Sequence, residues 1–166
     1  CAMMANHTGL REGGNQFSLK KLEKYQKSCQ FYAIYVSPVL PQDEAKRYAP
    51  QAYELLMREF EQNSDLLRFC TTYEDAQKAA EEGRHAAFLS LENSAWMEGD
   101  PKKLAEYREK GVRLVSLTHR LDNLYGCGND TQDDTGLTEL GKRFTREIYD
   151  QNLLFDVSHL SFKSFW

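Results

Sequence analysis

HAAFLSLEN, residues 85–93, is a short run of apolar and small side chains that ends in a carboxylate and an amide. Runs of this length and near-continuous hydrophobicity are typical of strands covered on both faces, as in a parallel sheet. Three similar runs are QFYAIYV (30–36), VRLVSL (112–117) and LLFDV (153–157), and LLRFC (66–70) is a weaker candidate. The sequence therefore predicts a sheet built from short, buried strands.

Helical segments separate these runs, and several have readable ends. Thr72 is the expected N-cap of a helix that runs to Glu82, with Asp75 as its capping-box partner and Gly83 as the stop. A second helix is predicted between the N-cap Asp100, which Pro101 follows at the first helical position, and the stop glycine Gly111. Thr138 opens a third, in which an apolar residue recurs every four positions at Leu140, Phe144 and Ile148.

The segment 43–63 is also helical in character, although Pro50 is expected to start a new helix or to kink this one. Alternation of strands and helices at this spacing indicates βαβ units and a parallel sheet. Neither a G-x-G-x-x-G nor a P-loop motif is present. We predict an α/β fold of parallel strands alternating with helices, in a single domain over residues 1–166.

Composition excludes several classes of protein. The net charge of −4 argues against nucleic-acid binding, and the sequence has no apolar run of 18 residues that would span a membrane. The cysteines are far apart, without a C-x-x-C pair, so we expect them to be reduced and structural and the compartment to be cytoplasmic. They are Cys1, Cys29, Cys70 and Cys127.

Three predicted strands are followed by an ionisable residue: Glu92, His119 and His159. Because the carboxyl ends of parallel strands meet at one edge, these side chains are expected to converge there. A carboxylate with imidazoles is the ligand set of a hydrolytic zinc site. From spacing alone, alternatives stay open: Glu92 could cap a turn, His119 could bond to backbone, and His159 could be structural, with Asp156 nearby to orient it.

The sequence has two further histidines, and one of its predicted loops is unusually long. His85 begins its strand and is expected to be structural, and His7 is expected in a surface loop. The segment THRLDNLYGCGNDTQDDTGL, residues 118–137, is much longer than most strand-to-helix loops, and long loops are usually functional. Its Leu124 and Tyr125 are candidates to pack on another part of the molecule.

Three segments carry a resemblance to a known family. HAAFLSLEN, GVRLVSLTH and GLTELGKRFTREIYDQNLLFDVSHLSFKSFW resemble successive parts of the membrane dipeptidase (renal dipeptidase) family of zinc metallopeptidases, most closely its bacterial members. CQFYAIYVSP resembles the strand after the family's first metal motif. The resemblance implies part of a (β/α)₈ TIM-like barrel, a dipeptide substrate, with a D-residue tolerated at the C-terminal position, and an association as a homodimer.

The resemblance also implies roles for particular residues. Glu92 matches a glutamate that bridges two zinc ions, and His159 matches a ligand of one of them. His119 matches a residue that binds substrate and stabilises the tetrahedral intermediate. Asp156 is expected to support the strand end near His159. The implied reaction is two-zinc hydrolysis, in which a water activated by the metals attacks the peptide carbonyl.

The sequence departs from the family in lacking its Asp-x-His pair and its later histidine and aspartate ligands. We therefore expect residues 1–166 to be one incomplete catalytic domain, about half of a barrel, and to be inactive alone. Two other readings remain: a barrel metallohydrolase of the amidohydrolase type, and a non-catalytic α/β binding domain that has lost its metals.

Overall fold

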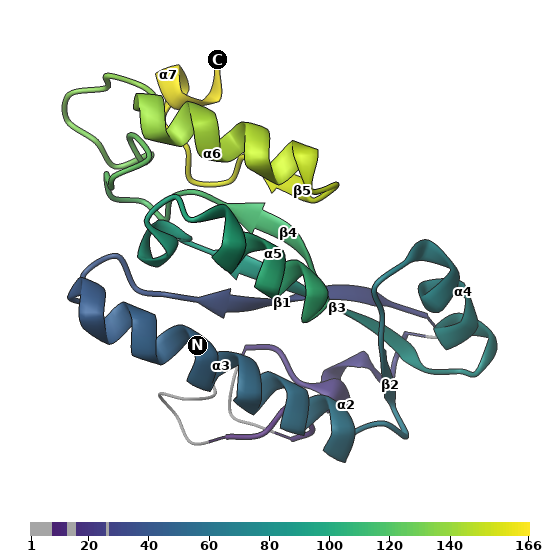
Figure 1. The fold of residues 1–166 in the computed structure, drawn as a ribbon. Coiled ribbons are helices and arrows are strands. Elements are labelled where there is room, and N and C mark those ends of the chain that lie inside the picture. Colours follow the sequence, from purple (N-terminus) through teal and green to yellow (C-terminus); the bar gives the residue numbers. More distant parts are fainter. Residues whose placement is uncertain (1–7, 13–15, 26) are drawn as a thin grey trace.

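The computed structural model describes residues 8–12, 16–25 and 27–166 (Figure 1). All five predicted strand segments are strands. They are β1 (Cys29–Tyr35), β2 (Leu67–Phe69), β3 (His85–Glu92), β4 (Val112–Ser116) and β5 (Leu154–Asp156). The helices are α2 (Leu19–Leu22), α3 (Gln42–Gln62), α4 (Tyr73–Glu81), a 3₁₀ turn η1 (Ala95–Met97), α5 (Pro101–Glu109), α6 (Glu139–Asp150) and α7 (Phe162–Phe165).

The strands form one parallel sheet in the order β1-β3-β4-β5, and β2 also pairs with β3. One edge of β3 pairs with β1 along most of its length. The other edge pairs first with β2 and then, beyond an irregularity at Leu89 and Ser90, with β4. Because every pair is parallel, the carboxyl ends of β1, β3, β4 and β5 lie along the same edge of the sheet.

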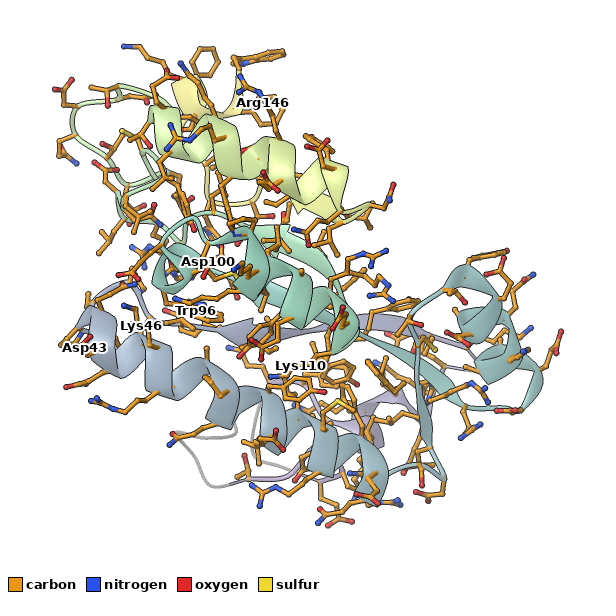
Figure 2. The ribbon with its side chains drawn as sticks, viewed as in Figure 1. Asp43, Lys46, Trp96, Asp100, Lys110 and Arg146 are labelled. Carbon is orange, nitrogen blue, oxygen red and sulfur yellow. The ribbon has the colours of Figure 1, made fainter. Side chains whose placement is uncertain are left out.

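Helices α3, α5 and α6 follow one another along the sheet in chain order (Figure 1). Their apolar residues meet β1, β3 and β4 in one core that includes Leu89, Leu91 and Val115, each at most 1% exposed. Trp96 lies between α3 and α5 (Figure 2), with its ring 5.2 Å from that of Tyr107. This packing holds the segment after β3 firmly against the helices.

One strand differs from the sequence expectation. The strand before His159 was expected to be buried, but Leu154 is 59% exposed and Val157 42% exposed. The reason is that β5 pairs only with β4 and lies at the end of the strand order. No described strand follows β5, so this exposure is a property of residues 1–166 and does not test burial of β5 in a longer chain.

The predicted helix ends are confirmed. The Thr72 hydroxyl accepts from the backbone N–H of Asp75, and the Asp75 carboxylate accepts from that of Thr72, each at 3.1 Å. The backbone N–H of Thr71 also donates to Asp75, and these bonds lower the pKa of its carboxyl. Asp100 and Thr138 cap α5 and α6 through the N–H groups of Lys102 and Gly141.

Of the two alternatives expected at Pro50, the start of a new helix is wrong, because α3 runs without a break from Gln42 to Gln62, while a kink stays a prediction. Pro50 is exposed, so water can solvate the carbonyl that loses its helical donor. On the other side of α3, Ala49, Ala52 and Leu56 are at most 2% exposed. Burial of this face outweighs the loss of one hydrogen bond.

The long loop between β4 and α6 is packed rather than free. Tyr125 is fully buried and its ring stacks on Phe144 of α6 at 4.8 Å. Its hydroxyl accepts from Gly99 N–H at 2.9 Å and donates to the Ser94 carbonyl at 3.3 Å, while burial raises its pKa. Gly141 lies so close to the Tyr125 carbonyl that a Cβ atom would be 1.9 Å from it.

The cysteines of the described residues, Cys29, Cys70 and Cys127, form no disulfide, whereas Cys1 lies outside those residues. Cys70 and Cys127 are buried, in agreement with a structural role. No helix in the described part of the chain is both long and apolar enough to cross a membrane.

Candidate metal centre

The structure brings together the three residues predicted from the strand ends. One ligand atom from each of Glu92, His119 and His159 lies within 4.8 Å of the other two. Oε1 of Glu92 is 3.4 Å from Nε2 of His159 and 3.7 Å from Nε2 of His119. All three side chains are half-buried, so the group faces the edge of the sheet and is open on one side.

Glu92 is positioned by the sheet and by the turn that follows it. It is the last residue of β3 and is in register with Tyr35 of β1. Asn93 then adopts a left-handed backbone, with φ 62°. Its side-chain amide donates to the Val36 carbonyl at 2.7 Å, and its oxygen accepts from Asn123 at 3.2 Å. The amide of Asn93 therefore ties β1, β3 and the long loop together next to Glu92.

His119 is held by rings on both sides. Its ring centroid is 4.7 Å from that of Tyr35 and 4.5 Å from that of His159. Its Nδ1 atom is buried and has no hydrogen-bond partner among the described residues. Buried polar atoms normally have a hydrogen-bond partner, so we expect water or an atom outside the described residues to pair with this nitrogen.

His159 is held by the long loop. Its backbone is left-handed, with φ 64°, and its carbonyl accepts from the Thr118 hydroxyl and from the Asn129 N–H, each at 3.0 Å. The Oδ1 atom of Asn129 lies 3.3 Å from Nδ1 of the ring. Asp156 instead accepts from the backbone N–H of Ser158 at 2.9 Å, and so shapes the turn before His159.

Asn93 and Asn129 are the supporting residues that sequence reasoning missed. The Asn93 signal was available, because an asparagine directly after a strand and its carboxylate suits a left-handed turn. Asn129 gave no such signal: it is one of many polar residues in the loop and lies 30 positions from His159.

The other two histidines do not join this group. His85 begins β3, at the end opposite Glu92, and its Nδ1 lies 2.8 Å from the Ser28 hydroxyl. This position agrees with the structural role expected for it. His7 lies outside the described residues.

A cavity of about 310 Å³ opens beside His119. Tyr35, Val39 and Leu121 give it apolar walls, and Arg120 and Asp130 line its polar side. Arg120 donates to Asp130 through Nε at 2.7 Å. Of the three candidate ligands, His119 lines this cavity, which is of a size that accommodates a small molecule.

The side chains present fit a zinc ion. Zinc accepts imidazole nitrogen and carboxylate oxygen, and catalytic zinc sites keep one position open. One carboxylate and two imidazoles converge here at the carboxyl ends of the strands. His119, which was expected on the substrate side, is thus also within reach of the same centre.

Comparison with known proteins identifies the family. The model of the membrane dipeptidase family (peptidase family M19) matches residues 3–166. The chain belongs to the membrane dipeptidase family. A dipeptidase family relative, dipeptidase aclJ of Aspergillus oryzae, is 28% identical over 167 residues, which cover 95% of this chain and 40% of that protein.

Solved structures show the same fold. The probable dipeptidase PvdM from Pseudomonas aeruginosa superposes with a TM-score of 0.83 at 24% identity, covering 93% of this chain and 42% of that one. A metallopeptidase from Rhodobacter sphaeroides, liganded with a phosphinate mimic of the dipeptide L-Ala-D-Ala, also gives 0.83, at 18% identity, over 98% and 55%. The predicted fold class, part of a dipeptidase barrel, is confirmed. The chain spans less than half the length of the curated relatives it matches.

Proposed function

We propose that residues 1–166 supply part of the active site of a zinc-dependent dipeptidase that hydrolyses the peptide bond of dipeptides. The observation that carries the proposal is the convergence of Glu92, His119 and His159 from three strand ends within 4.8 Å. Membership of the membrane dipeptidase family supports the same reaction. The D-residue at the C-terminal position is proposed because the Rhodobacter relative is liganded with a mimic of L-Ala-D-Ala.

In this proposal Glu92 and His159 would hold zinc, and the complete site would take two zinc ions. Bound zinc lowers the pKa of water towards about 7 and polarises carbonyl oxygens. The further ligands come from parts of the dipeptidase barrel that residues 1–166 do not include. Residues 1–166 alone are therefore expected to be inactive.

His119 has a different role in the proposal. Its Nε2 lies at the same centre, and Tyr35 packs edge-on against its ring, which restricts the ring's rotation. From this position Nε2 donates a hydrogen bond to the oxygen of the substrate carbonyl as negative charge develops on it. The adjacent cavity, between Tyr35 and Leu121, receives one side chain of the dipeptide.

The first test is metal content by elemental analysis of the complete gene product, with Glu92→Gln as the variant. The native protein is expected to hold close to two zinc ions per chain, and the variant fewer. The value of kcat/KM for L-Ala-D-Ala is expected to fall by more than about 100-fold, because outer-sphere partners alone are worth about 10- to 100-fold.

Glu106→Gln is the matched control, because Glu106 is an exposed glutamate paired with Lys110 on α5. It is expected to change neither the zinc content nor the rate. A well-folded native protein without zinc would overturn the enzyme assignment and favour a binding domain on the same fold. Zinc together with hydrolysis of non-peptide amides alone would favour an amidohydrolase.

A further inference from the structure

The loop of residues 118–137 carries a line of polar contacts that ends at His159. Two guanidinium nitrogens of Arg120, Nε and Nη2, each lie 2.7 Å from Oδ2 of Asp130. The other carboxylate oxygen of Asp130, Oδ1, accepts from the side-chain amide nitrogen of Asn129 at 2.9 Å. The amide oxygen of Asn129 then lies 3.3 Å from Nδ1 of His159.

The chemistry of these groups determines where the hydrogens are. A carboxylate only accepts, so the NH₂ group of Asn129 must face Asp130 and its oxygen must face His159. That oxygen also only accepts, so it favours a hydrogen on the ring atom opposite it, Nδ1. The Glu92 carboxylate faces Nε2 at 3.4 Å and favours a hydrogen there until a metal ion lies between the two groups. A neutral imidazole with a hydrogen on Nδ1 leaves Nε2 free to accept or to bind a metal.

The backbone holds the contacting residues close together. Asp130 N–H donates to the Arg120 carbonyl at 2.9 Å, and Asn129 N–H donates to the His159 carbonyl at 3.0 Å. Gly128 makes this possible, since a Cβ atom there would lie 2.1 Å from the Arg120 carbonyl oxygen. The loop therefore contacts His159 through its backbone and its ring at once.

We propose that Arg120, Asp130 and Asn129 are positioning residues that favour the Nδ1–H tautomer of His159 and present its Nε2 to the metal. This inference deepens the proposed function and rests on it for the metal, although the tautomer itself can be measured without metal. Metal-binding histidines commonly donate their second ring nitrogen to an oxygen acceptor, and such partners strengthen binding. Arg120 is the residue farthest from His159 in this line of contacts, and its ion pair with Asp130 is exposed and therefore weak.

The decisive measurement is the tautomer of His159 in the metal-free complete gene product carrying Glu92→Ala, which removes the acceptor that faces Nε2. Long-range ¹H–¹⁵N spectra at about pH 8.5, where ordinary imidazoles are neutral, report which ring nitrogen carries the hydrogen, and His159→Gln assigns the signal. The Nδ1–H pattern is expected in the Glu92→Ala protein. An Nε2–H pattern there would overturn the proposal.

Variants of Asn129 test the consequence. Asn129→Ala is expected to lose the Nδ1–H preference and to weaken zinc binding by about 10- to 100-fold in competition with a chelator. Asn129→Asp keeps an oxygen acceptor for Nδ1 but cannot donate to Asp130 and sets two carboxylates side by side. It is expected to keep the Nδ1–H preference while the contact with Asp130 is lost. Arg120→Gln is expected to weaken zinc binding by only about 2- to 5-fold.

Gln132→Ala is the control on the same loop, because Gln132 is exposed and its amide reaches only the Asp130 backbone carbonyl. Equal zinc affinity in Asn129→Ala and Gln132→Ala would overturn the positioning role. If the Glu92→Ala protein shows the Nδ1–H pattern but the native protein binds no zinc, the proposed function fails while the tautomer assignment stands. The two failures are thus distinguishable.

Discussion

Glu92 and His159 face each other across 3.4 Å, yet the molecule positions them by different means. Glu92 ends β3, which is paired on both edges and whose neighbouring Leu91 is 1% exposed. His159 follows β5, the last described strand, and is held by polar groups of the loop between β4 and α6.

The comparison shows that two neighbouring ligands can be held in place by different contributions to the free energy of folding. The position of Glu92 depends on apolar burial, which also stabilises the whole fold. The position of His159 depends on hydrogen bonds at a half-exposed site, each of which contributes little to global stability. Changes on the β3 side should therefore alter folding, and changes on the loop side should alter metal binding.

Leu91→Ala is expected to have the largest effect on stability. Leu91 packs between Ile34 of β1 and Val115 of β4, so truncation leaves a cavity and lowers the free energy of unfolding by about 2–5 kcal/mol. Denaturant unfolding of the complete gene product measures it. Gln132→Ala should stay within about 0.5 kcal/mol of the native value. A similar small effect of Leu91→Ala would mean that β3 does not form the core beside Glu92.

Substitutions of Asn93 test how Glu92 is positioned, because Asn93 stabilises the neighbouring turn through both its backbone and its side chain. Asn93→Ala loses two amide hydrogen bonds and places alanine in a left-handed backbone, so a loss of about 2–4 kcal/mol is expected. Asn93→Gly loses the same bonds without the backbone strain and should be about 1–2 kcal/mol less destabilising. Equal effects of both variants in thermal unfolding would contradict the left-handed turn.

Asp134 gives the smallest expected effect, on the loop side. The Ser161 hydroxyl at 2.6 Å, helped by the backbone N–H groups of Lys163 and Gly136, holds the pKa of the Asp134 carboxyl below its usual value. Its contribution to stability is therefore complete above the unfolded-state pKa, near about 4, and is lost as the pH falls through the lower folded-state value.

Asp134→Asn tests this by melting temperature against pH. The native protein should melt higher than the variant at neutral pH, and the difference should shrink as the pH falls below about 4. A difference that is constant with pH would show that the carboxylate charge has no part in holding α7 to the loop.

Much of the fold followed from local signals. The five strand segments, the Thr72 and Thr138 caps and the stripe through Phe144 depend on neighbours in sequence, and all were predicted. One alternative failed because distant packing decided it. Burial of one face of α3 keeps the helix continuous through Pro50.

The sequence by itself determined that Glu92, His119 and His159 would lie at one edge, because parallel strands place their carboxyl ends together. Only the tertiary structure decided which polar groups hold them. Asn129 contacts His159 across 30 positions and Asn123 contacts Asn93 across the same separation, and no local pattern encodes such pairs. Side-chain hydrogen bonds are short and directional, so they form only after the sheet and loop have brought their partners within about 3 Å.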